Sequence, residues 1–190
     1  MQVVRKASLF IALGLAFGAS MAGEITGSGV FSTGAVNTSA GFLSTARQNV
    51  GVAEQSGKIA NTAVIVNGAV NTSVGFLSTA NQSIARATQN GQISQTAVVA
   101  QGVNNTAAGF LSTANQEVGF AKNDGKVQGT FVGATGVSNV AGGFLASANQ
   151  QIGGAQGSGK LTNSTVLATA QFNNAAGFLS TADQSVGVAK

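Results

Sequence analysis

The residue types on which most enzymes rely are scarce in this 190-residue chain, which contains no His and no Cys. Without them there is no ordinary Ser-His or Cys-His nucleophile pair, and zinc and soft metals lose their main ligands. The five acids fall at different positions of a sequence repeat, so no carboxylate pair for glycoside hydrolysis is predicted; they are Glu24, Glu54, Glu117, Asp124 and Asp183. The sequence therefore predicts a protein that is not an enzyme and that holds no metal or cofactor.

Amide side chains, in contrast, recur at a constant spacing in five copies of one repeat. Asn occupies one position of each copy and Gln another: Asn37, Asn71, Asn105, Asn139 and Asn173, and Gln48, Gln82, Gln116, Gln150 and Gln184. A surface amide faces few constraints, so five unchanged copies favour buried amides that hydrogen-bond to the next copy along a stack. The alternative for the Asn column is a turn position, which Asn favours, whereas Gln has no such preference.

The chain follows this period without insertions. Gly-Phe-Leu begins at residues 41, 75, 109, 143 and 177, which places five phenylalanines in one column: Phe42, Phe76, Phe110, Phe144 and Phe178. Glycine turns such as Ser56-Gly57 and Asn90-Gly91 separate the copies. We divide residues 23–190 into five tandem repeats, approximately 25–57, 58–91, 92–125, 126–159 and 160–190.

Composition and local pattern favour strands over helices. Only 7% of residues are charged and Pro is absent, a combination typical of stacked cross-β structure. The segment 59–66, rich in β-branched residues, is predicted to be a strand. One pattern favours a helix, because Phe76, Ala80 and Ile84 lie four residues apart. Four of the five copies place Gly directly after the Val/Ile column that contains Ile84, however, and Gly costs about 1 kcal/mol in a helix interior. We therefore predict an all-β protein, with a β-plus-helix repeat as the alternative.

The predicted fold is a parallel β-solenoid, a cross-β stack of the five 34-residue repeats. Each copy is expected to fold into two or three short strands, and successive copies to stack about 4.8 Å apart. Val and Ile ladders are expected to fill a dry core together with five leucines: Leu43, Leu77, Leu111, Leu145 and Leu179. Both ends of such a stack present open strand edges that can join further chains, so the fold predicts end-to-end polymerisation.

The N-terminus has the pattern of a secretory signal peptide over residues 1–22. Arg5 and Lys6 precede an apolar run at 7–17, and residues 19–22 offer a cleavage site before Gly23. The run is too short to span a bilayer comfortably, so no membrane span is expected after its removal. Cleavage removes Arg5 and Lys6 and no acid, which lowers the net charge from +4 to +2. So small a charge does not support specific nucleic-acid binding.

One motif of the repeat, Asn-x-Ala/Ser-x-Gly-(x)6-Gln-x-Val/Ile-Gly-x-Ala, runs for example from Asn105 to Ala121. It resembles the repeats of bacterial functional amyloids, the curlins and Fap-type fibre subunits, over residues 25–190. The unit is longer than a curlin repeat, and the long variable linkers and C-terminal Cys pair of Fap-type subunits are missing. The resemblance implies secretion as an unfolded chain, nucleated assembly outside the cell, and a role in biofilm matrix or adhesion.

We therefore expect a secreted structural subunit of a self-assembling extracellular amyloid-like fibre. The expected partners are further copies of the chain joined end to end, secretion and nucleation proteins, and matrix polysaccharide. Lys58, Lys126 and Lys160 form one column, and a row of lysines favours binding of an anionic polysaccharide. The plainer interpretation is that these lysines only keep the surface of the stack solvated. The alternatives are a monomeric secreted β-solenoid that binds a surface such as ice or a glycan, and a helical repeat scaffold that binds proteins.

Overall fold

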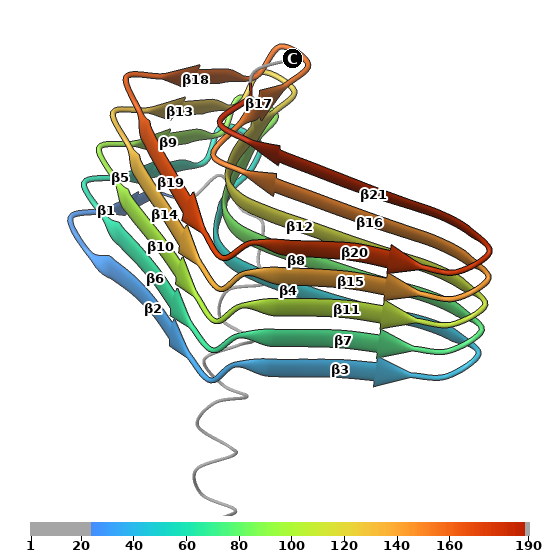
Figure 1. Cartoon of the computed structure of the whole chain (residues 1–190). Coiled ribbons are helices and arrows are strands. Elements are labelled where there is room, and N and C mark those ends of the chain that lie inside the picture. The colour runs from blue at the N-terminus through green and yellow to red at the C-terminus, as the bar shows by residue number, and fades with distance from the viewer. Residues whose placement is uncertain (1–23, 189–190) are drawn as a thin grey trace, which may run out of the picture.

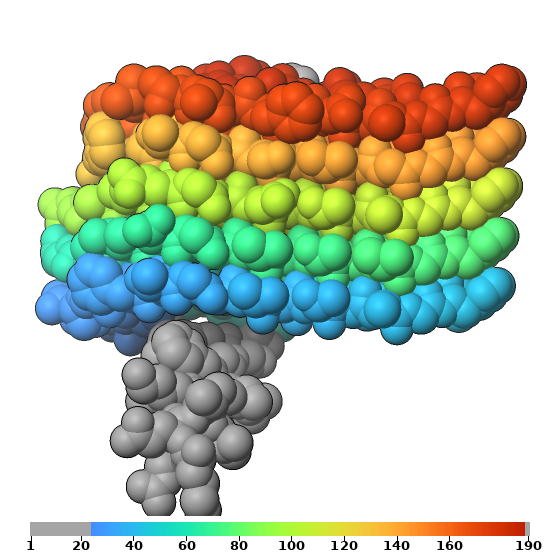
Figure 2. Space-filling model, turned by 60° about the horizontal axis from the view of Figure 1, so that its bottom comes forward, coloured from blue at the N-terminus to red at the C-terminus, as the bar shows by residue number. Residues whose placement is uncertain are grey.

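The computed structural model describes residues 24–188, which form a parallel β-solenoid of five coils, one for each copy of the repeat (Figure 1). The predicted all-β fold is confirmed. Each strand pairs with its equivalent in the neighbouring copy of the repeat, so that Asn71 lies beside Asn105 and Gln82 beside Gln116. The coils therefore lie in layers on one another, which Figure 2 shows as five bands of colour.

Four parallel sheets run along the stack, and the strands of sheets A, B and C have three to five residues. Sheet A consists of β1 (Glu24–Thr26), β5 (Lys58–Ala60), β9 (Gln92–Ser94), β13 (Lys126–Gln128) and β18 (Lys160–Thr162). Sheet B consists of β2 (Gly29–Thr33), β6 (Ala63–Asn67), β10 (Ala97–Gln101), β14 (Phe131–Thr135) and β19 (Thr165–Thr169).

The other two sheets form the long arm of each coil. Sheet C consists of β3 (Val36–Ala40), β7 (Val70–Val74), β11 (Asn104–Ala108), β15 (Ser138–Gly142) and β20 (Phe172–Ala176). Sheet D holds the longest strands: β4 (Leu43–Ala53), β8 (Leu77–Thr88), β12 (Leu111–Lys122), β16 (Leu145–Ile152) and β21 (Leu179–Val186). A short strand, β17 (Ala155–Gln156), also pairs with β12 in this sheet.

Each copy contributes one strand to each of the four sheets, the fourth copy adds β17, and the expectation of two or three strands was wrong. The segment 59–66, predicted to be one strand, divides at Asn61 into β5 and β6, because Asn61 has a φ of 52°. The corresponding residues of the other coils, such as Gln95 and Gly129, also have positive φ. A single left-handed residue turns the chain at this corner without a recognisable loop, which is why the sequence pattern did not reveal the corner.

The helical alternatives are wrong for the described residues, because no helix occurs in residues 24–188. The Gly-Phe-Leu segment instead turns the chain from sheet C to sheet D at the tip of the long arm, and the Leu begins the sheet D strand. The four-residue spacing of Phe76, Ala80 and Ile84 is also an even spacing. It therefore fits alternate residues of a strand as well as one face of a helix.

The turn that connects successive copies is tight. Gln89 and Asn90 have φ values of 53° and 67°, and the Gly91 amide donates to the Thr88 carbonyl over 3.0 Å. This geometry is that of a type I′ turn. The glycine follows the two left-handed residues and serves a different purpose, since a Cβ on Gly91 would lie 2.2 Å from the carbonyl oxygen of Ala53 in the preceding coil.

The stack encloses two cores of different composition. The first lies between sheets A and B and the far half of sheet D, and consists of Val and Ile ladders that include Val64, Val98 and Val132. The second lies between sheet C and the near half of sheet D. It contains alanines such as Ala114 and Ala148 together with the buried amides.

The leucine column lies outside both cores, and the expectation that it fills the core was wrong. Leu43 and Leu179 are 70% and 59% exposed on the outer face of sheet D. Alternate residues of a strand face opposite sides, and the inward positions of β4 belong to Ser44 and Ala46. The small inward residues let sheets C and D approach closely, which leaves no room for leucine between them.

Replacing Gly109 with Ala tests the close approach of neighbouring coils. An added Cβ would lie 1.7 Å from the Gly75 carbonyl oxygen, so the backbone ladder must shift, and we expect a loss of about 1–3 kcal/mol in the free energy of unfolding. Gly142→Ala is the matched control, because nothing lies within 4 Å of its added Cβ and a change within about 0.5 kcal/mol is expected. Urea unfolding followed by circular dichroism measures both, and equal stabilities would contradict the packing described.

Candidate functional site

The Asn column forms a continuous hydrogen-bonded ladder between sheets C and D. Each Nδ2 donates to the Oδ1 of the Asn in the next coil over 2.8–2.9 Å, from Asn37 to Asn173. The same nitrogen donates across the core to sheet D, and Nδ2 of Asn105 lies 3.0 Å from the carbonyl oxygens of Ala80 and Asn115. These bonds offset the cost of burying the amides and tie the two sheets together. The turn alternative for this column is wrong, since its members lie inside the strands of sheet C.

The Gln column forms a second ladder, in sheet D, whose bonds run in the opposite direction. Each Nε2 donates to the Oε1 of the Gln in the preceding coil over 2.6–2.7 Å, from Gln82 back to Gln48 and from Gln184 back to Gln150. Gln116 and Gln150 are fully buried. The two ladders give the stack a polarity. Among residues 24–188 the first coil leaves an Asn acceptor and a Gln donor without a ladder partner, and the last coil leaves an Asn donor and a Gln acceptor.

The Phe column lies at the exposed tip of the long arm. Its five rings stack with centroids 5.0–5.2 Å apart and with interplanar angles of 0–13°. The three inner rings are 43–44% exposed, whereas Phe42 and Phe178 at the ends are 69% and 76% exposed. The rings cover one another along the axis but not on their outer edge, so the column is a continuous apolar stripe on the surface.

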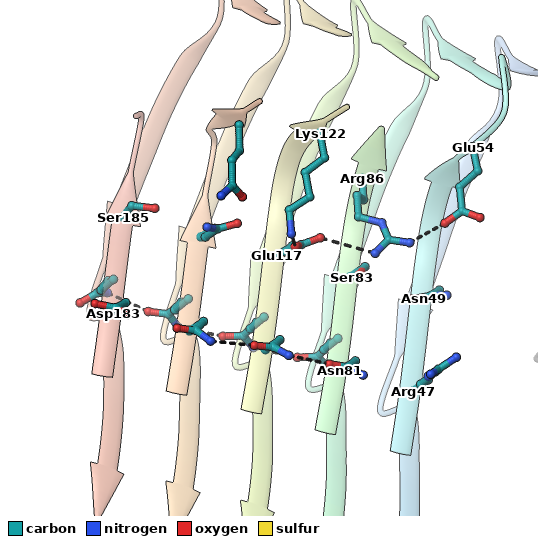
Figure 3. Close-up of a pocket in the computed structure, with 18 residues that line it drawn as sticks. Arg47, Asn49, Glu54, Asn81, Ser83, Arg86, Glu117, Lys122, Asp183 and Ser185 are labelled. Atoms are coloured by element: carbon teal, nitrogen blue, oxygen red, sulfur yellow. Dashed lines mark hydrogen bonds and ion pairs between the residues drawn. The ribbon is translucent and has the colours of Figure 1, made fainter. Parts of the chain in front are cut away.

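A polar groove of about 900 Å³ follows the outer face of sheet D across all five coils (Figure 3). Arg86 lies at its centre and forms ion pairs with Glu54 of the preceding coil and with Glu117 of the following coil, the latter with Nη1 and Oε2 3.6 Å apart. Lys122 forms a further ion pair with Glu117, which is only 8% exposed. Two carboxylates and two cations are thus arranged alternately along the groove.

The ion pairs of the groove could not be found from the repeat, because they join residues out of phase with it. Arg86, Glu54 and Glu117 stand at three different positions of the repeat, so no column contains two of them. The five acids do lie at different positions of the repeat, but this does not keep all of them apart in space. The structure brings Glu54 and Glu117 to opposite sides of one guanidinium group, where both carboxylates are already paired with cations.

A third amide ladder lies in the same groove. Nδ2 of Asn115 donates to Oδ1 of Asn81, and Nδ2 of Asn149 donates to Oδ1 of Asn115, each over 2.9 Å. Arg47 occupies this position in the first coil and Asp183 occupies it in the last, and Figure 3 shows them at opposite ends of the row. The sequence does not mark this column as a ladder, because its end residues are not amides.

The lysine column of sheet A is less basic than the spacing suggested. Lys126 and Lys160 lie side by side, but Gln92 separates them from Lys58. Lys58 forms an ion pair with Glu24 over 3.4 Å. A hydrogen bond from Thr26 and the nearby Lys58 hold the pKa of the Glu24 carboxyl below its ordinary value.

Neither the search for metal-binding clusters and membrane-spanning helices nor the comparison with known proteins assigns a function to this chain. No cluster of residues that could hold a metal ion occurs in residues 24–188. Within the same residues no helix is long and apolar enough to cross a membrane, and the predicted signal peptide lies outside them. No family model, curated protein or solved structure matches the chain.

Asn105→Ala tests the central ladder. The change leaves Nδ2 of Asn71 without its Oδ1 acceptor and Oδ1 of Asn139 without its donor, both in a buried site, so we expect a loss of about 1–3 kcal/mol in the free energy of unfolding. Asn104→Ala is the control one residue away. Its side chain is exposed and accepts one hydrogen bond, from Thr106, and a change within about 0.5 kcal/mol is expected. A loss in Asn104→Ala as large as in Asn105→Ala, measured by urea unfolding, would count against a special role of the ladder.

Proposed function

We propose that this protein is the structural subunit of a self-assembling extracellular amyloid-like fibre, which serves biofilm matrix or surface adhesion. The observation that carries the proposal is the state of the two ends of the stack. Among residues 24–188 no helix, loop or irregular coil covers the first or the last coil, and each end finishes in the edge strands of four sheets. Open edges of this kind are templates for further strands.

The side chains of the end coils are consistent with this proposal. Ala114 and Ala148 are fully buried inside the stack, whereas Ala182, their equivalent in the last coil, is exposed. Gln184 is likewise exposed, although Gln150 directly beneath it is fully buried. A further coil on this end would bury the same residues in the same surroundings as the coils inside the stack. Repeat proteins that remain monomeric usually prevent this with a polar terminal repeat.

Secretion and the predicted partners other than further copies of the chain rest on the sequence. The signal-peptide pattern supports export, and the resemblance to curlin and Fap-type repeats supports secretion and nucleation partners. A parallel in-register stack with amide ladders and stacked aromatic rings has the physical features of cross-β fibres.

A monomeric glycan binder is the second candidate, and the groove of sheet D is the observation that favours it. Amide groups line it at regular spacing, together with the hydroxyls of Ser83 and Ser185 and with paired charges at its centre. Such a binder should bind a soluble polysaccharide as a monomer, and Arg86→Ala together with Asn115→Ala should weaken that binding. The fibre proposal needs neither result.

The assembly of residues 23–190, which contain every described strand, tests the fibre proposal. After dilution from denaturant we expect a lag, then a joint rise in β circular dichroism and thioflavin-T fluorescence, and no lag when preformed filaments are added. The reason is that the first filament must form without an existing filament end to grow from, whereas each seed presents open strand edges that further copies can join. The full chain is measured beside it, to learn whether residues 1–22 delay growth.

A folded β-solenoid that stays monomeric at all accessible concentrations would contradict the fibre proposal. Light scattering and electron microscopy distinguish that outcome from slow assembly, because seeds added to a competent subunit must lengthen.

A further inference from the structure

The two ends of the stack carry opposite charges in the same column of sheet D. Arg47 stands in the first coil, Asp183 in the last, and the three coils between them have Asn81, Asn115 and Asn149. Both charged side chains are exposed. A column that is neutral inside and oppositely charged at its ends is suited to pairing with a second copy of itself.

The direction of the hydrogen bonds in this column indicates which end of one copy should meet which end of the next. In each inner pair the amide of the later coil donates to the amide of the earlier coil, as Asn149 does to Asn115. Asp183, as a carboxylate, can only accept from the coil that follows it, and Arg47 can only donate to the coil that precedes it. If a first coil follows a last coil, Arg47 donates to Asp183 in a charge-assisted bond that has the same direction as the bonds between the inner amides.

Sheet A offers a second pair with the same logic. Glu24 belongs to the first coil, and Lys160 occupies the equivalent position of the last. Within the chain Lys58 already pairs with Glu24 over 3.4 Å from one coil away, which shows that the spacing of coils suits a Lys–Glu contact in this column. At a joint Glu24 would lie between Lys160 of the preceding copy and its own Lys58.

The buried amide ladders complete one another at the same joint. Within residues 24–188 no donor reaches Oδ1 of Asn37, and Nδ2 of Asn173 has no Asn above it. In the same described part of the chain, Oε1 of Gln184 accepts no hydrogen bond, and Gln48 has no Gln below it. Stacking a first coil on a last coil supplies one donor and one acceptor to each copy, because the two ladders run in opposite directions.

Apolar residues of the end coils also meet in this arrangement. Phe172 and Val36 share a column of sheet C and are 54% and 70% exposed, and the inner coils have Val70, Asn104 and Ser138 in this column. An end-to-end joint shields these two side chains from water, where their burial favours association.

We propose that two copies join with the 34-residue register unbroken, so that Arg47 and Glu24 of one copy pair with Asp183 and Lys160 of the copy before it. The inference rests on the proposed function and adds the polarity and the partner residues of the joint. A joint of two first coils or of two last coils contains neither pair. The charges thus select head-to-tail growth and a single register.

Two charge-reversal variants, studied alone and mixed, test this proposal. Arg47→Asp places an acid against Asp183 at every joint, and Asp183→Arg places two arginines there, so each variant alone should elongate seeds of its own kind about tenfold more slowly than the wild type does at low salt. In an equal mixture every joint between unlike copies again places one arginine against one aspartate. The mixture should therefore assemble at close to the wild-type rate into filaments that contain both variants.

Controls of equal charge change separate the joint from the net charge. Gln101→Glu combined with Asn104→Asp, and Gln101→Lys combined with Asn104→Lys, place the same two units of charge on exposed residues of the middle coil, and both should elongate like the wild type. Circular dichroism before assembly confirms that each variant folds. The rate differences should shrink in 1 M salt, where the screening length falls to about 3 Å.

The outcomes are distinct for the two proposals. If wild-type chains form no filaments, the proposed function fails and this inference fails with it. If the wild type assembles but the mixture is no faster than the single variants, or if the single variants grow like the wild type, the fibre proposal stands and the proposed joint is wrong.

Discussion

The structure depends on one constraint, which is that the backbone of each coil hydrogen-bonds to every coil next to it. A parallel ladder keeps its pairing only if neighbouring coils have equal length, so the 34-residue spacing has no insertion between Glu24 and Val188. Once the backbones are in register, each side chain lies beside its equivalents. Every position of the repeat therefore has to tolerate being stacked on its own kind.

This stacking explains which residues occupy the columns. Amides suit it because each is both a donor and an acceptor, and the ladders of Asn105 and Gln116 use both functions. Glycine is needed where backbones of neighbouring coils nearly touch, as at Gly109. Charges suit it poorly, because a column of like charges repels itself. The low content of charged residues follows, and those of the groove pair between columns, as Arg86 does with Glu117.

The same constraint connects the fold to assembly. A coil in the middle of the stack has a backbone neighbour on each side, whereas an end coil has one. The last coil therefore presents to another chain the same kind of strand edges that each inner coil presents to the next. What distinguishes the ends is their charge, with Arg47 and Glu24 at one and Asp183 and Lys160 at the other. The outer groove and the Phe stripe run parallel to the axis, so both would extend unbroken along a fibre built in this way.

The sequence by itself determined the period, the all-β fold, the number of coils and the columns of Asn, Gln and Phe, because in-register stacking converts repetition directly into spatial proximity. It did not determine how each coil bends. Single left-handed residues such as Asn61 divide predicted strands, and the alternation that starts at Leu43 turned the leucines outward to solvent. Contacts out of phase with the repeat, above all those of Arg86, depend on how two neighbouring columns face each other. Only the tertiary structure decided these features, because they arise from distances between columns, about which a period along the chain carries no information.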